Sequence, residues 1–262
     1  MAAANPSLSI IVFLLLTVCY FIFKYYTKTS TTVKYVTFGY FLALILFQFF
    51  INLGLTNDIC GFSQPGTALK VTILPWLLIF GTVSVLLSLF PSWLTPFSNT
   101  IGYLFAYITG VDTFFKEILS DRTLSDKKSA NNSQGNADMV AAIKNVYEDK
   151  SLLINSMTTS TVKQWWDIMK NGGLLKPGVD NSQFDELSGY IKMKTEIAEF
   201  IWYALTGVLT TSVSYNAILN SGCQQSVKEM EKRHAQYLAQ ESKIAKTKEE
   251  KKGSQMVYKS YE

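Results

Sequence analysis

The chain has 262 residues, of which 48% are hydrophobic and 14% aromatic, and it carries a formal net charge of +4. This composition supplies several apolar segments and one modest polar domain, and so small a charge argues against nucleic acid as the main partner. The three cysteines form no close pair, which excludes a cysteine-based zinc motif and a CxxC redox motif.

Four apolar segments have the length that a bilayer requires, about 17–25 residues for a hydrocarbon core of roughly 30 Å. They cover residues 7–23, 35–55, 71–90 and 196–220. Because every backbone polar group inside lipid must be paired within its own segment, we expect these segments to be helices. The first segment also resembles a signal peptide, but no basic residue opens it and no cleavage site follows before Lys24, so we expect a retained span.

The residues that follow the third segment differ from it in composition. Residues 90–103 have the sequence FPSWLTPFSNTIGY, which is dense in aromatic and turn-forming residues. Residues 101–115 are apolar but too short to cross a bilayer, so we expect an interfacial or re-entrant segment, with Ser98 and Asn99 capping its helix. The membrane region therefore extends over residues 1–115.

We expect this motif to act as a rigid elbow where the chain leaves the membrane. Its prolines restrict φ, and its Trp and Tyr rings suit the headgroup level. The residues of the predicted elbow are Pro91, Trp93, Pro96, Asn99 and Tyr103.

Residues 116–195 form the only sizeable polar insert. Eleven basic and eleven acidic residues lie between Pro91 and Thr195, a balance that indicates a solvated surface. Apolar residues recur every three or four positions over residues 138–157 and again over residues 162–169, which predicts two helices. Trp165 and Trp166 either contact another protein or fill the small core of the insert.

The tail, residues 221–262, contains a charged stretch that predicts a helix over Val227–Lys252. Met230, Tyr237 and Ile244 repeat at heptad spacing, but polar residues occupy the positions between them, so a sustained coiled coil is not expected. The helix is either a solvated helix with one apolar stripe or a docking helix for a partner.

The distribution of lysines predicts the orientation. The turn after the first span carries three lysines and the loop after the second carries only Lys70, which places the first turn and the insert on the cytosolic side. Cys60 and Cys223 then lie on the opposite side, each just beyond a membrane boundary. They form either a disulfide or two free thiols, while Cys19 packs inside the first span.

Chemistry-bearing residues are scarce. The single histidine, His234, has no nucleophile or metal partner at useful spacing, and no phosphate-binding loop occurs. Glu196 and Glu199 either form a proton or cation site or complement the dipole at the start of a helix. Polar residues of the fourth span, such as Thr211, either line a pore or pack one helix against another. We expect no enzyme activity, cofactor, metal or small-molecule substrate.

Three stretches in and next to the third and fourth spans have a specific wording: TILPWLLIFG (residues 72–81), FPSWLTPFSNTIGY (residues 90–103) and WYALTGVLTTSVSYNAILNSGC (residues 202–223). Their combination resembles a membrane protein family of the nucleocytoplasmic large DNA viruses. In these viruses a membrane lies beneath a capsid, and membrane-spanning minor capsid proteins join the two. The resemblance covers about a third of the chain and omits the insert and the tail.

These observations predict an all-α membrane protein with about four transmembrane helices, a small helical insert outside the membrane and a charged C-terminal helix. The resemblance implies a structural protein in the internal membrane of a virion, which anchors that membrane to the capsid shell. Its partners would be the lipid bilayer and other capsid or membrane proteins. A channel or transporter subunit and an accessory subunit of an organellar complex are the alternatives.

Overall fold

The computed structural model describes residues 6–27, 29–120, 149–171, 174–223 and 227–253. In these residues the backbone is helical apart from short connections and one isolated antiparallel bridge between Leu119 and Leu175. The chain is therefore an all-α protein, as the sequence predicts.

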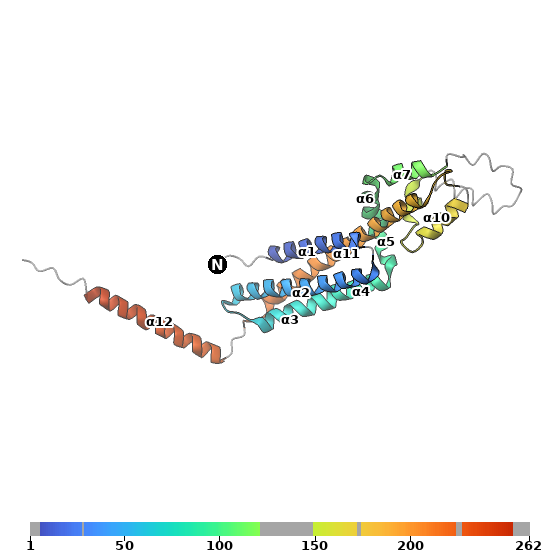
Figure 1. The fold of residues 1–262 in the computed structure, drawn as a ribbon. Coiled ribbons are helices and arrows are strands. Elements are labelled where there is room, and N and C mark those ends of the chain that lie inside the picture. Colours follow the sequence, from blue (N-terminus) through green and yellow to red (C-terminus); the bar gives the residue numbers. More distant parts are fainter. Residues whose placement is uncertain (1–5, 28, 121–148, 172–173, 224–226, 254–262) are drawn as a thin grey trace, which may run out of the picture. The chain divides into compact units, whose positions relative to one another are not determined.

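Among the residues that the structure describes, four helices are long and apolar enough to cross a membrane. Their bounds are Ser7–Tyr26 for α1, Ser30–Cys60 for α2, Pro65–Leu89 for the stretch α3–η1–α4, and Asn181–Asn220 for α11. Within the third helix, α3 covers Pro65–Pro75, η1 covers Trp76–Gly81 and α4 covers Thr82–Leu89. Figure 1 shows the four helices side by side, and they are called the bundle below.

The helices extend beyond the predicted spans. α2 has 31 residues and ends only where Gly61 adopts a left-handed conformation, with φ of 68°. α11 has 40 residues and begins at Asn181, so the predicted boundary between residues 195 and 196 falls inside a helix. A change from polar to apolar composition does not interrupt the backbone hydrogen bonds of a helix, so a boundary drawn from composition need not coincide with a helix end.

Aromatic side chains fill the interior of the bundle. The rings of Tyr20, Tyr40 and Tyr203 stack as a triangle, with the Tyr20 centroid 4.4 Å from that of Tyr40 and 6.2 Å from that of Tyr203. The Phe80 ring meets the Tyr203 ring edge-on at 5.1 Å. Buried aromatic residues of all four helices belong to this cluster: Phe13, Tyr20, Phe21, Tyr40, Trp76, Phe80 and Tyr203. Large apolar side chains on the outer faces of the same helices are exposed, as lipid contact requires.

The chain leaves the third helix at Phe90, whose backbone is not helical (φ −123°, ψ 72°). Pro91 follows and disfavours a helical conformation at the residue before it, so α4 must end here. Pro91 then opens the 3₁₀ helix η2 (Pro91–Leu94), and Pro96 lies in the first turn of α5 (Thr95–Phe97). The two prolines therefore start helices at the predicted elbow.

The predicted single segment over residues 101–115 is divided in two by the structure. The helical stretch α5–η3–α6 runs through η3 (Ser98–Gly102) and α6 (Tyr103–Ile108), and α7 (Val111–Ile118) follows it. The break is Gly110, whose φ of 106° suits glycine far better than a residue with a side chain. The apolar composition predicted the helices but not this reversal between them.

A second core lies at the end of the bundle where α1 finishes and α11 begins. It joins α6, α7, α9 (Lys150–Asn155), α10 (Val162–Asn171) and the first half of α11, as Figure 1 shows. We call this assembly the outer unit. The predicted helix at residues 162–169 is confirmed, whereas residues 138–148 of the other predicted helix lie outside the described residues.

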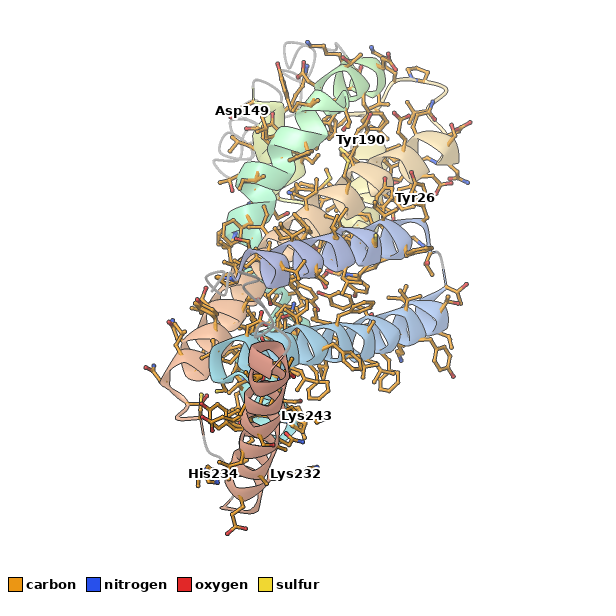
Figure 2. The ribbon with its side chains drawn as sticks, turned by 90° about the vertical axis from the view of Figure 1, so that its left-hand side faces the viewer. Tyr26, Asp149, Tyr190, Lys232, His234 and Lys243 are labelled. Carbon is orange, nitrogen blue, oxygen red and sulfur yellow. The ribbon has the colours of Figure 1, made fainter. Side chains whose placement is uncertain are left out.

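The last described helix, α12 (Val227–Gly253), belongs to a separate unit of the chain and confirms the predicted tail helix. Lys232, His234 and Lys243 project from it into solvent (Figure 2).

Candidate functional site at the junction of the bundle and the outer unit

An ion-pair cluster ties α1 to α11. The Lys24 ammonium lies 3.0 Å from a Glu196 carboxylate oxygen and 2.5 Å from one of Glu199, and all three side chains are largely buried. The prediction that the two glutamates complement the start of a helix is wrong, because α11 begins fifteen residues before Glu196. Their negative charge instead compensates that of a lysine at the end of α1.

One turn before Glu196 on α11, Lys192 makes a second connection to α1. Its ammonium donates to the backbone oxygen of Tyr25 at 2.6 Å and lies 5.3 Å from the centre of the Tyr25 ring. Tyr26, at the end of α1, and Tyr190, on α11, are labelled at this junction in Figure 2. The turn after the first span therefore lies at the same end of the bundle as the outer unit, as the four-span topology requires.

Lys194 is a cation at the centre of the junction, with only 1% of its surface exposed. Its ammonium donates to Asn99 Oδ1 at 3.0 Å, to the Ile154 backbone oxygen at 2.9 Å and to Asn155 Oδ1 at 3.1 Å. Three donors thus meet three oxygen acceptors, which is how a buried charge is tolerated. The lysine holds η3, α9 and α11 together, and sequence reasoning missed it.

The close packing of η3 on α11 depends on Gly102. A Cβ at this position would lie 2.5 Å from the Lys194 backbone oxygen, far inside van der Waals contact. The predicted capping role of Ser98 and Asn99 is wrong, because neither side chain caps the helix that continues through them. Asn99 instead accepts a hydrogen bond from Lys194, so it belongs to the junction as a structural residue.

Asp149 fixes the short helix that supplies two of the three acceptors. Its carboxylate accepts hydrogen bonds from the backbone N–H of Ser151, at 2.9 Å, and from the Ser151 hydroxyl. These hydrogen bonds hold the pKa of the Asp149 carboxyl below its usual value, because they stabilise the charged form. The ionised carboxylate therefore caps α9 in the position from which Ile154 and Asn155 reach Lys194.

Two of the other predicted elbow residues, Trp93 and Tyr103, make contacts through the backbone or through their rings. The Trp202 indole N–H donates to the backbone oxygen of Trp93 at 3.0 Å, and the Trp202 ring meets that of Phe97 edge-on. The Trp93 ring stacks on Phe90 and is 46% exposed, while Tyr103 packs against the core of the outer unit. Whether Trp93 and Tyr103 lie at the headgroup level stays a prediction.

Trp165 and Trp166 pack inward. Trp166 is 5% exposed and lies in the core of the outer unit, with its ring 5.6 Å from that of Phe184. Trp165 is partly buried against the same core. Of the two alternatives that the sequence left open, the geometry favours the filling of the core.

The outer unit instead exposes an apolar stripe on the helical stretch η3–α6. Its four residues lie at spacing i, i+3, i+4 and i+7, and each is at least 39% exposed: Ile101, Leu104, Phe105 and Ile108. No charged residue occurs anywhere between Val71 and Val111. The sequence contains this spacing, but the apolar composition of the segment favours a membrane element and does not by itself predict a protein contact on this face.

The predicted contact residues of the tail are Met230, Tyr237 and Ile244, and all three are exposed on α12. This exposure is compatible with both alternatives for the tail, a solvated helix and a docking helix, and their role stays a prediction.

Cys60 and Cys223 are both disulfide-bonded, and Cys19 is free. Cys60 is the last residue of α2, at the end of the bundle remote from Lys24. Of the two alternatives that the sequence left open, a disulfide and two free thiols, the structure favours the disulfide. That Cys60 and Cys223 are bonded to each other stays a prediction.

Among the described residues no group of three or more His, Cys, Asp or Glu side chains could hold a metal ion. No protein-family model, curated protein or solved structure matches the chain.

Proposed function

We propose that the protein is a structural, non-enzymatic membrane protein that anchors a bilayer to a layer of other proteins. The observation that carries this proposal is the continuity of α11, whose 40 residues span about 60 Å at 1.5 Å per residue. Its first half lies in the core of the outer unit and its second half in the bundle. A single helix with both ends packed transmits force between the two without a hinge.

The contacts at the junction support this rigid connection. Lys194 joins α11 to two other elements of the outer unit, and Lys24 and Lys192 join it to α1. Each of these contacts bridges segments that are far apart in the sequence. An anchor needs such cross-links, because its load passes between the membrane and the outer unit.

The apolar stripe of η3–α6 supplies a surface for the partner. Anchors at i, i+3, i+4 and i+7 are the pattern by which a helix docks into an apolar groove. The absence of charge on the stretch fits a partner surface that is apolar and uncharged. We therefore assign the contact with the protein layer to Ile101, Leu104, Phe105 and Ile108.

The resemblance of the third and fourth spans supplies the biological setting of the proposal. In that setting the bilayer is the internal membrane of a large DNA virus particle, and the protein layer is its capsid shell. The rival role of a channel or transporter subunit gains no support from the bundle, because aromatic rings of all four helices occupy its interior.

Site-specific photo-crosslinking tests the proposal. The photoreactive residue benzoylphenylalanine is introduced at Phe105, on the stripe, or at Phe50, which is 64% exposed on α2 and faces outward from the bundle. Irradiation of intact membranes or particles should give protein adducts from position 105 and lipid adducts from position 50. The phenylalanine at position 50 is the matched control, because the substituted residue type is the same.

Lipid adducts alone from position 105 would contradict the assignment of the stripe to a protein partner. Ion flux through liposomes that contain only the purified protein would favour the channel alternative instead. Recovery of the chain in purified virions, with an adduct to a capsid protein, would support the viral setting.

A further inference from the structure

The interior of the bundle contains a polar layer with unmet hydrogen-bonding groups. Trp76, Thr211 and Ser214 are each at most 2% exposed. The Trp76 indole N–H and the hydroxyls of Thr211 and Ser214 find no hydrogen-bond partner among the residues that the structure describes. A polar group buried without a partner costs about 1–3 kcal/mol, so three in one bundle call for an explanation.

Packing brings these residues to neighbouring turns of the bundle. The Phe13 ring of α1 occupies the space beside Gly207 of α11, and its centroid lies 5.6 Å from that of the Trp76 ring. Thr211 and Ser214 follow Gly207 on the same face of α11, one and two turns further along. The Trp76 ring therefore lies near the level of Gly207, and the two hydroxyls lie on the next two turns of α11.

The other two helices also contribute polar groups at this level. Ser9 lies one turn before Phe13 on α1, and its hydroxyl donates to the side-chain oxygen of Gln48 on α2. The Gln48 amide donates in return to the Ser9 backbone oxygen at 3.0 Å. The polar layer thus draws on all four helices, and it is defined by Ser9, Gln48, Trp76, Thr211 and Ser214.

We propose that the polar layer binds one or more water molecules, which bridge Trp76, Thr211 and Ser214. The indole N–H can only donate, so its ligand must accept a hydrogen bond. The two hydroxyls can both donate and accept, so they suit a ligand that does both. A charged ligand would be costly at this depth in the bundle, and water is the small neutral molecule that satisfies all three groups.

The sign of a stability change distinguishes a hydrated layer from a dry one. In a dry layer, Thr211→Val removes an unsatisfied hydroxyl, and the midpoint of thermal unfolding should rise or stay constant. In a hydrated layer the same change removes a partner of the water, and the midpoint should fall by about 2–4 °C in a chain of this size.

Thr210→Val is the matched control. Thr210 is also fully buried, but its hydroxyl donates to the Thr206 backbone oxygen at 2.8 Å within the same helix. The proposal expects a smaller fall for Thr210→Val than for Thr211→Val. Equal shifts for the two variants, or a rise for Thr211→Val, would overturn it.

A direct measurement does not depend on how the variants fold. In the full chain with ¹⁵N-labelled tryptophan, the Trp76 indole proton should show a magnetisation transfer from water, and Trp76→Phe assigns its signal. Trp202 is the internal control, since its indole N–H is already bonded to the Trp93 backbone oxygen. Transfer to Trp76 but not to Trp202 supports the bound water, and no transfer to Trp76 refutes it.

Discussion

At the residue scale, Lys194 and Lys192 show how two similar side chains acquire different roles. They are two positions apart on α11, which turns them about 200° from each other around the helix axis. Lys192 reaches along the surface to Tyr25, whereas Lys194 points into the junction and is satisfied there by three oxygens. A buried charge is tolerated when it keeps all its hydrogen-bond partners. Removal of the charged group, or of a partner, leaves the remaining polar groups unpaired.

Lys194→Met should therefore destabilise the outer unit. The substitution retains the length of the side chain but leaves the partly buried side-chain oxygens of Asn99 and Asn155 without their donor, and we expect a loss of about 2–4 kcal/mol in the free energy of unfolding. Lys163→Met, at an exposed position of α10, is the control and should change stability by less than about 0.5 kcal/mol. Thermal unfolding in detergent measures both variants, and similar midpoints for the two would contradict the role of Lys194.

The cysteines give a second prediction at this scale. Non-reducing digestion should release one peptide pair that joins Cys60 to Cys223, because both are disulfide-bonded and the third cysteine is free. Alkylation of the denatured, unreduced protein should label Cys19 alone. Labelling of all three cysteines would rule out the bond in the isolated protein.

At the element scale, the exit from the third helix combines a backbone turn with a side-chain contact. Phe90 and Pro91 end α4, and Asn99 supplies one acceptor to Lys194. The Trp93 ring, by contrast, is half exposed, and only its backbone oxygen receives the Trp202 hydrogen bond.

Asn99→Ala should therefore cost more stability than Trp93→Ala in detergent. Loss of the Asn99 oxygen removes a hydrogen bond to a charged donor, worth about 1.5–3 kcal/mol. The Trp93 backbone oxygen survives the second substitution, so only ring contacts are lost. Thermal unfolding of the two single variants compares their losses of stability. A larger loss for Trp93→Ala would show that the Trp93 ring stabilises the elbow more than the Asn99 hydrogen bond does.

The cap of α9 gives a pH prediction. The folded pKa of Asp149 lies below its usual value of about 3.8, so its contribution to stability is present above that value and is lost as the pH falls through the folded pKa. The protection factors of the α9 amides, which correct the exchange rates for the pH dependence of the intrinsic rate, should fall below about pH 4. In Asp149→Asn the α9 amides should show much less of this change, and an unaltered pH profile would assign the transition to another group.

The positions of the membrane helices follow from local composition, and this is why the sequence predicted them. The contacts between residues that are distant in the sequence do not follow from local composition. Nothing in the sequence around Lys194 distinguishes it from Lys192, and the pairing of Lys24 with Glu196 and Glu199 joins segments about 170 residues apart. The spacing of the four residues predicts one apolar face on this helix. Only the packing of Gly102 against α11 shows which face of η3–α6 is left uncovered.

At the scale of the whole molecule, the four membrane helices predict on which side of the bilayer the N-terminus and the tail lie. An even number of crossings places the N-terminus and the tail on the same side of the bilayer. Protease protection of terminal tags in sealed vesicles checks this, with a tag inserted at residues 130–131 of the polar insert as the control for the opposite side. Protection of one terminus and digestion of the other would contradict four crossings.

Because α11 extends beyond the bundle, a change in its tilt displaces its outer end sideways. Residues 181–196 extend for about 24 Å at 1.5 Å per residue. Transmembrane helices tilt to match the local bilayer thickness, and a change in tilt of about 10° would displace the outer end of such a helix sideways by about 4 Å. Because the outer unit packs on this end of α11, local thinning or curvature of the bilayer would move the apolar stripe sideways, so the position of the stripe would depend on the shape of the membrane beneath it.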